Sequence, residues 1–120
     1  MKNIPIIFLI VILQACGGDL VCTTDIRSGV IIDVYEEDGS EPLCGFDLEL
    51  IDGEYIESYN SPDLSPCQSF RFRGAIERPG TYQFVISKAG YQTYVSEEFT
   101  LRSDGCHVIT QNFQIRLKKI

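Results

Sequence analysis

The chain has 120 residues, a length that suits one domain, and its charged and apolar fractions are ordinary for a folded protein. Its formal net charge of −7 comes from scattered acidic residues, so its surface repels phosphate backbones and nucleic acid is excluded as a partner. Strand-forming residues are plentiful and tryptophan is absent, which favours β-structure.

The N-terminus has the layout of a secretory signal peptide. Met1-Lys2-Asn3 is a short basic start, and an apolar run of about ten residues follows from Ile4 to Leu13. Such a run is too short to cross a hydrocarbon core about 30 Å thick, which needs about 20 residues. We therefore expect residues 1–15 to be a leader that directs export and is then removed.

Leu13-Gln14-Ala15-Cys16 at the end of this leader resembles the lipobox of bacterial lipoproteins. The resemblance implies cleavage before Cys16, a thioether from its thiol to diacylglycerol, and a membrane anchor held by two or three acyl chains. Gly17 in place of an aspartate implies sorting to the outer membrane, and residues 16–26 would form a short lipidated linker. An ordinary signal peptide cut nearby is the alternative, but that pathway prefers a small residue where Leu13 stands.

Alternating apolar residues predict three strands in the first half of the mature chain. Their expected bounds are Arg27 to Glu36, Cys44 to Ile51 and Glu54 to Tyr59. The residues expected to face inward are Val30, Ile32 and Val34 in the first strand, and Cys44, Phe46, Leu48 and Leu50 in the second. Asp52-Gly53, between the second and third strands, is a type I′ hairpin signal.

The second half of the chain continues the same alternation. The expected strands are Gln68 to Arg73, Thr81 to Lys88, Tyr91 to Val95 with Phe99 to Arg102 (one broken strand or two short ones), and Cys106 to Leu117. The residues expected to face inward are Phe70, Phe72, Tyr82, Phe84, Ile86, Ile109, Phe113, Ile115 and Leu117. The pattern predicts an all-β fold, a seven-stranded, antiparallel-rich β-sandwich over residues 27–120.

Four cysteines remain beside Cys16, and an even number in an exported chain indicates disulfide bonds. The predicted hairpin returns the chain to Cys44 shortly before Cys67, which favours a Cys44–Cys67 bond. Cys22 and Cys106 each precede a long strand, and they start at the same end if these strands lie side by side and parallel. We therefore expect Cys22–Cys106 as the second bond. Zinc is the rival interpretation, but the closely spaced cysteine pairs of zinc sites are missing, so no metal is expected.

Several short motifs resemble the carboxypeptidase regulatory-like domain, a group with a transthyretin-like sandwich. They are Asp38-Gly39, Pro42-Leu43-Cys44, Asp52-Gly53, Glu77-Arg78-Pro79-Gly80-Thr81-Tyr82, Lys88-Ala89-Gly90-Tyr91 and Cys106-His107-Val108. The motifs span about residues 28–118 and are similar to a lipoprotein branch of the group. The resemblance implies a non-catalytic module that often accompanies larger exported proteins. In its Gly-x-Tyr motif we expect Gly80 to turn the chain and Tyr82 to pack its ring with the hydroxyl in water.

No set of residues predicts a catalytic site. Some transthyretin-like proteins hydrolyse a purine breakdown product with several histidines and a Tyr-Arg-Gly-Ser ending, whereas this chain has one histidine and ends in Lys118-Lys119-Ile120. Serine-type catalysis would need His107, which we expect to be structural or exposed beside its disulfide cysteine. Glu36, Glu37 and Asp38 are consecutive acids without the spacing of a calcium loop, so no cofactor is expected.

Four tyrosines are candidate ligand contacts, on the expectation that they are exposed and can stack on a sugar or a partner protein. They are Tyr35, Tyr55, Tyr59 and Tyr94. Ordinary cross-strand pairing is the alternative. Together these observations favour a lipid-anchored, non-catalytic binding or scaffold module of the bacterial cell envelope, acting through a protein partner. A carbohydrate-binding module is the second interpretation, and a small hydrolase is the third.

Overall fold

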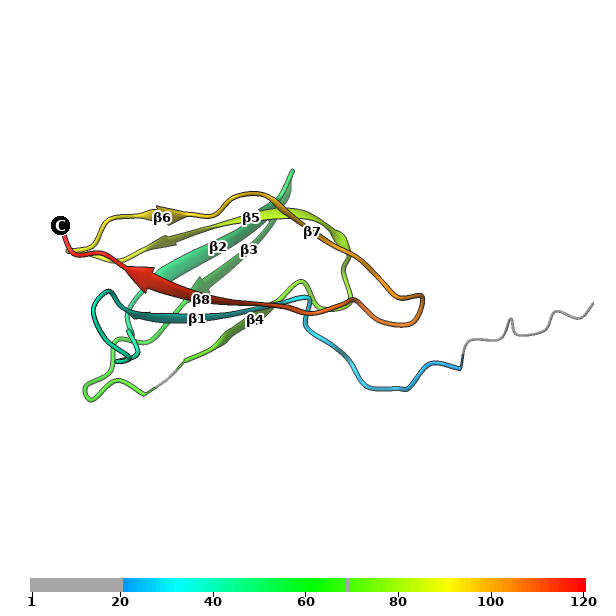
Figure 1. Cartoon of the computed structure of the whole chain (residues 1–120), viewed down its shortest axis with the longest axis horizontal. Helices are drawn as coiled ribbons and strands as arrows, with labels where there is room; N and C mark the ends of the chain where they lie inside the picture. The colour runs from blue at the N-terminus through cyan, green and yellow to red at the C-terminus, as the bar shows by residue number, and fades with distance from the viewer. Residues whose placement is uncertain (1–20, 69) are drawn as a thin grey trace, which may run out of the picture.

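The computed structural model describes residues 21–68 and 70–120, and this part of the chain is all-β without a helix (Figure 1). It contains eight strands in two sheets, where about seven strands were expected. The strands are β1 (Val30–Glu36), β2 (Asp47–Asp52), β3 (Tyr55–Asn60), β4 (Phe72–Gly74), β5 (Gly80–Ser87), β6 (Tyr94–Val95), β7 (Phe99–Leu101) and β8 (Gln111–Leu117). The predicted all-β architecture is confirmed and is consistent with a sandwich. The predicted leader and Cys16 lie outside the described residues.

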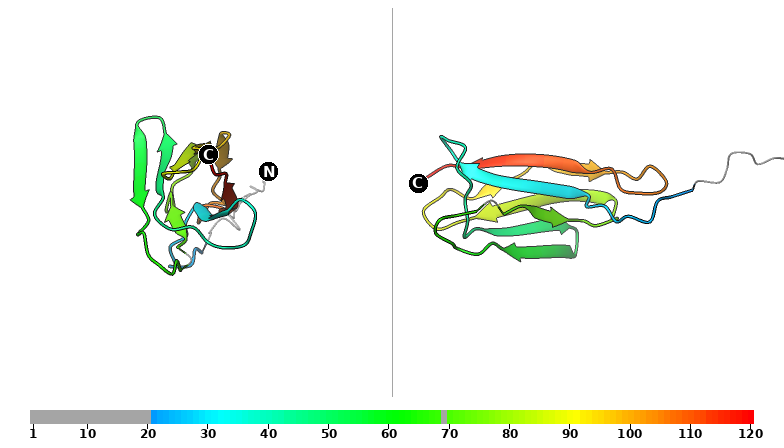
Figure 2. Two further views of the ribbon diagram at one scale, coloured as in Figure 1. Left: turned by 90° about the vertical axis from the view of Figure 1, so that its left-hand side faces the viewer. Right: turned by 90° about the horizontal axis from the view of Figure 1, so that it is seen from below.

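The smaller sheet has the strand order β4-β1-β8. β1 pairs antiparallel with β4 and parallel with β8, in a ladder that runs from Val30 and Gln111 to Glu36 and Leu117. Figure 2 shows β1 and β8 side by side along the length of the molecule. The two strands therefore begin at the same end, as the reasoning on Cys22 and Cys106 required.

The larger sheet has the order β3-β2-β5-β6, and β7 also pairs with β5. The predicted hairpin between β2 and β3 is confirmed, and Gly53 in its turn has a φ of +63°, which costs glycine nothing. β6 and β7 lie along the same edge of β5, so the predicted broken strand is two short ones. Between them Ser96 is buried; its backbone N–H donates to the Phe84 carbonyl at 2.9 Å, and its Oγ accepts the Phe84 N–H at 2.9 Å in place of a backbone carbonyl.

Both sheets turn their apolar faces toward one core, as the period of two in the sequence predicted. Its buried members include Val30, Ile32 and Val34 of β1, Leu48 and Leu50 of β2, Tyr82, Phe84 and Ile86 of β5, and Ile115 and Leu117 of β8. The sequence predicted that the Tyr82 hydroxyl is exposed to water, and this prediction is wrong. Tyr82 is 1% exposed and its hydroxyl donates to the Arg78 carbonyl at 2.8 Å.

Strand ends differ from the predicted ones where local turns interrupt the alternation. β8 begins at Gln111 rather than Cys106, because the preceding residues form a loop closed by a bridge between Ser103 and Val108. Ile109 was expected to face inward and is instead 51% exposed. β2 begins after Gly45, whose φ of +73° breaks the extended backbone.

The two ends of the sandwich carry different parts of the chain. The chain enters the sandwich through residues 21–29, here called the leading segment, at the end that we call the near end (right in Figure 1). The β4–β5 and β7–β8 loops lie beside the leading segment at this end. At the far end lie the β3–β4 loop and the C-terminus. The Cys44–Cys67 disulfide, with a Cα–Cα distance of 5.7 Å, ties the β3–β4 loop to the chain before β2 and confirms the predicted pairing.

Candidate functional site

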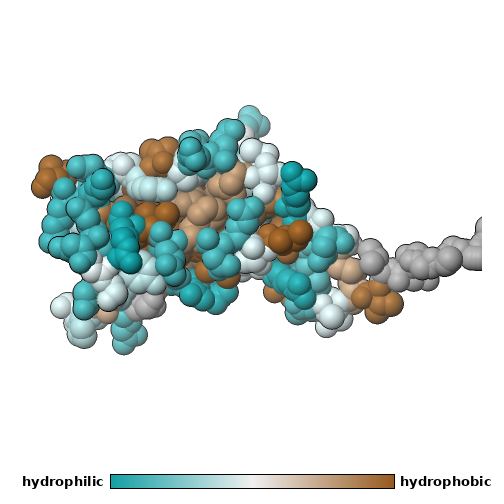
Figure 3. All heavy atoms as spheres, in the orientation of Figure 1, coloured by the Kyte–Doolittle hydropathy of each residue, from teal (hydrophilic) through white to brown (hydrophobic). Residues whose placement is uncertain are grey.

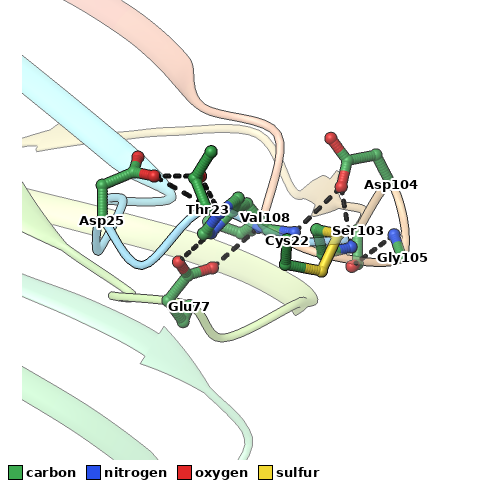
Figure 4. Close-up of a disulfide and its surroundings, with 10 residues drawn as sticks. Cys22, Thr23, Asp25, Glu77, Ser103, Asp104, Gly105 and Val108 are labelled. Carbon is green, nitrogen blue, oxygen red and sulfur yellow. Dashed lines mark hydrogen bonds and ion pairs between the residues drawn. A yellow bond between two sulfur atoms is a disulfide. The ribbon is translucent and has the colours of Figure 1, made fainter. Parts of the chain in front are cut away.

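Three segments that are far apart in the sequence meet at the near end: the leading segment, the β4–β5 loop and the β7–β8 loop. The Cys22–Cys106 disulfide joins the first to the third across 84 residues, with a Cα–Cα distance of 5.2 Å (Figure 4). The predicted pairing is confirmed. Its cause is the parallel pairing of β1 with β8, which starts both strands at this end.

His107 is the centre of the hydrogen bonds at this junction, and it is 7% exposed. Its Nδ1 lies 2.5 Å from Glu77 Oε2, and its Nε2 lies 2.9 Å from the Thr23 hydroxyl (Figure 4). A carboxylate can only accept, so the imidazole donates through Nδ1. Asp25 Oδ1 lies 3.5 Å from Nε2 on the solvent side. His107 therefore connects the leading segment to the β4–β5 loop from a buried position.

Glu77 has a φ of +48°, a left-handed backbone that is rare for any residue except glycine. Its carboxylate also accepts the Val108 N–H at 2.9 Å and the Arg27 N–H at 3.1 Å, and its own N–H donates to the Arg27 carbonyl. These bonds lower the pKa of Glu77, and the hydrogen bond from His107 is the largest cause. The loop conformation is thus held by contacts to both neighbouring segments.

Asp104 shapes the β7–β8 loop from within. Its Oδ1 accepts the backbone N–H groups of Cys106 and His107, both at 2.9 Å, which is a local turn typical of aspartate. The pKa of Asp104 is lowered, first by the N–H of His107. The turn presents Cys106 and His107 together to the leading segment. We call the Cys22–Cys106 disulfide with Thr23, Glu77, His107 and Asp104 the clamp.

Thr23, His107 and Glu77 stand in the order of a nucleophile, a base and an orienting carboxylate. Acyl transfer also needs N–H donors directed at the developing oxyanion. At the clamp, the N–H groups of Cys106, His107 and Val108 all donate to carboxylates instead. The chemistry that this geometry supports is the fastening of the leading segment to the sandwich.

Sequence reasoning singled out Cys22, Cys106 and His107 at this end but did not find Thr23, Glu77 or Asp104. Glu77 was noted only as the first residue of a family motif, and thirty residues separate it from His107. The predicted linker over residues 16–26 is fastened to the domain at Cys22. The one signal for these contacts in the sequence was the Cys106-His107 dipeptide. A disulfide between Cys22 and Cys106 also brings the residues next to each cysteine together, so His107 was bound to lie close to Thr23.

The four candidate tyrosines do not form an exposed aromatic surface, which corrects the sequence expectation. All of them are half-buried: Tyr35, Tyr55, Tyr59 and Tyr94. The Tyr59 ring packs 5.7 Å from the Phe72 ring between the sheets, and the Tyr94 ring stacks 5.9 Å from the Phe84 ring. A period of two places alternate residues on one face, but it does not tell which face of an edge strand such as β3 or β6 is covered.

One of these tyrosines lines a hollow in the surface between β6 and β8. The hollow has a volume of about 290 Å³ and is lined by Gln92, Thr93, Tyr94, Arg116, Leu117 and Lys118. Its wall combines one aromatic ring with three cationic or amide side chains. No second tyrosine of the candidate set lies among these lining residues.

The acidic turn after β1 is engaged by a neighbouring loop. The Tyr91 hydroxyl donates to the Glu36 carboxylate at 2.5 Å, and this bond is the largest cause that raises the pKa of Tyr91 to about 12.

Within residues 21–68 and 70–120, no three His, Cys, Asp or Glu side chains are grouped so that they could hold a metal ion.

No family model matches the chain, and no curated protein or solved structure matches it significantly. In the part of the chain that the structure describes, no helix is long and apolar enough to span a membrane.

Proposed function

We propose that the chain is a membrane-anchored, non-catalytic binding or scaffold lipoprotein of the bacterial cell envelope. The observation that carries the proposal is Cys16 directly after the leader-like residues 1–15, followed six residues later by Cys22, which is bonded into a compact β-domain. Acyl chains on Cys16 would hold this domain at a membrane, and Gly17 supports the outer membrane as the address. The domain would act through an envelope protein partner.

Both disulfides support an exported location, because such bonds persist in oxidising compartments and are rare in the cytosol. Two β-sheets packed over one core are also what the transthyretin-like, carboxypeptidase regulatory-like group would require. We therefore include this finer fold assignment in the proposal. Since fold does not determine activity, the non-catalytic role is argued from the clamp, where His107 and the nearby N–H groups are already bonded.

A carbohydrate-binding role was based on exposed tyrosines, and the half-buried positions of all four remove that observation. A hydrolase role was based on His107, whose Nδ1 is bonded to Glu77 and whose Nε2 lies beside Thr23. We carry neither as a second function.

Cys16→Ala tests the proposal in cells. We expect this variant to accumulate with its leader uncleaved and to take up no labelled palmitate, because the thioether cannot form without the thiol. The measurement is palmitate labelling together with the intact mass of the protein. Cys106→Ala is the matched control, and it should still be labelled and cleaved. Normal maturation of Cys16→Ala would refute the lipid anchor.

A further inference from the structure

Four large apolar side chains are exposed around the near end of the sandwich. They are Val21 at 89%, Ile26 at 74%, Ile76 at 53% and Ile109 at 51% of their surface, and we call them the apolar rim. Figure 3 shows apolar residues in brown at the end of the molecule where the grey chain joins it. Single exposed apolar residues are ordinary on a surface, and Ile56, Leu64, Val95 and Ile120 are exposed elsewhere on the domain. The four residues of the rim differ from these in that they lie on the three segments that meet at one end.

The rim residues surround the clamp and come from all three segments that it joins. Val21 precedes the disulfide-bonded Cys22, and Ile109 follows Val108, whose N–H is bound by Glu77. Ile26 directly precedes Arg27, and Ile76 directly precedes Glu77. The Glu77 N–H donates to the Arg27 carbonyl, and the Arg27 N–H donates to the Glu77 carboxylate. The clamp therefore fixes the rim in place before any partner arrives, which reduces the entropy lost on binding.

The chain outside the described residues restricts what the rim can meet. Six residues lead from Cys16 to Cys22, and a fully extended chain of that length spans at most about 20 Å. If acyl chains hold Cys16 in a bilayer, the near end is confined to that distance from the lipid surface. The far end has no such restriction, because the fastened leading segment joins the domain at the near end.

The charges around the rim carry both signs. Asp25 forms an ion pair with Arg27 at 2.8 Å, and Asp104 and Arg102 are both exposed in the β7–β8 loop. Such a mixture gives little attraction to anionic headgroups, which a basic cluster would provide. The contact that these side chains can make is apolar insertion at the boundary between headgroups and acyl chains.

We propose that the near end of the sandwich is a membrane-contacting face, in which the apolar rim rests in the lipid surface and the far end points away from it. This inference rests on the proposed lipid anchor at Cys16 and deepens it, since it fixes how the anchored domain stands. The occupant of the rim is phospholipid of the membrane that holds the acyl chains.

Single tryptophans test the orientation, because the natural chain has none. Ile109→Trp reports on the rim, and Leu64→Trp is the matched control in the β3–β4 loop, with Leu64 47% exposed against 51% for Ile109. The full lipidated protein is reconstituted in phosphatidylcholine vesicles whose acyl chains carry bromine, a contact quencher. We expect at least twofold quenching of the Ile109→Trp variant and none of the Leu64→Trp variant.

A second pair of substitutions separates rim contact from tethering. Adding Ile26→Ser and Ile76→Ser to the Ile109→Trp variant should reduce the quenching by at least half. Ile56→Ser and Val95→Ser are the control pair on β3 and β6, and these two residues are 53% and 56% exposed against 74% for Ile26 and 53% for Ile76. They should leave the quenching unchanged. Unreduced peptide mapping and far-UV circular dichroism verify that each variant keeps both disulfides and its β-structure.

Flotation and intact mass distinguish the possible failures. Acylated protein that floats with the vesicles but shows equal quenching at both positions would overturn the membrane-contacting face and leave the lipid anchor intact. A chain that carries no acyl mass and does not float would overturn the anchor and this inference with it. In the same vesicles, a tryptophan at position 109 that is shielded from aqueous acrylamide but not quenched by brominated lipid would assign the rim to a contact with another copy of the protein, which also overturns the proposal.

Discussion

Glu77 connects the three segments of the near end through a single side chain. Its carboxylate accepts from Arg27, His107 and Val108, and its backbone is held at a φ that asparagine or glycine would adopt more readily. Without the carboxylate, a 7% exposed imidazole and two backbone donors would lose their acceptor. Buried donors that lose a partner destabilise a fold more than an average hydrogen bond stabilises it.

We expect the stability of the domain to fall as the clamp carboxylates are protonated. The pKa values of Glu77 and Asp104 are lowered in the folded chain, so their contribution is fully present above their unfolded pKa values of about 4.5 and 3.8. It is lost as the pH falls through the lower, folded values. Urea unfolding monitored by circular dichroism should therefore show a midpoint that decreases between about pH 5 and pH 3.

Glu77→Gln isolates the contribution of this carboxylate. The variant should unfold at a lower urea concentration than the natural chain at pH 7, and its midpoint should decrease less steeply toward pH 3. Glu98→Gln removes the same charge from an exposed site and should reproduce the steeper decrease of the natural chain. Parallel curves for Glu77→Gln and the natural chain would show that the clamp carboxylate contributes nothing to acid sensitivity.

The two disulfides act on elements at opposite ends, and the lengths of chain they enclose differ. Cys22–Cys106 closes 84 residues and Cys44–Cys67 closes 23. In the chain-entropy model these loops correspond to about 4.5 and about 3.5 kcal/mol of stability. We expect the double variant Cys22→Ser with Cys106→Ser to lose more free energy of unfolding in urea than Cys44→Ser with Cys67→Ser. The reverse order would mean that strain or residual structure outweighs loop entropy.

The strands show which features a period of two can predict. Inward residues of β1, β2 and β5 follow directly from the alternation, and the disulfide pairing follows from strand direction once β1 and β8 are taken as parallel. The exposed Ile109 could not be predicted in this way, because Asp104 draws the chain before β8 into a turn. Nor could the clamp, since its hydrogen bonds join residues that no local pattern relates.

The two ends of the molecule differ, and the direction of its strands causes the difference. Because β1 and β8 are parallel and both start at the near end, the cysteines before them meet there, and the C-terminus after β8 reaches the far end. The apolar rim and the proposed anchor share one end, and the acidic turn after β1 lies at the other. A partner protein would therefore meet the loops around Cys44–Cys67 rather than the clamp.

Photo-crosslinking in cells tests directly which end of the domain faces the lipid and which end faces a partner protein. A benzophenone amino acid in place of Leu64, in the loop before Cys67, should give protein adducts, because this exposed loop points away from the proposed lipid surface. The same probe in place of Ile109 should give adducts of phospholipid mass, since the rim rests in the headgroup region. Gel shifts and mass spectrometry of the purified adducts distinguish the two. Protein adducts at position 109 together with lipid adducts at position 64 would reverse the orientation, and a domain lying flat on the membrane would give lipid adducts at both.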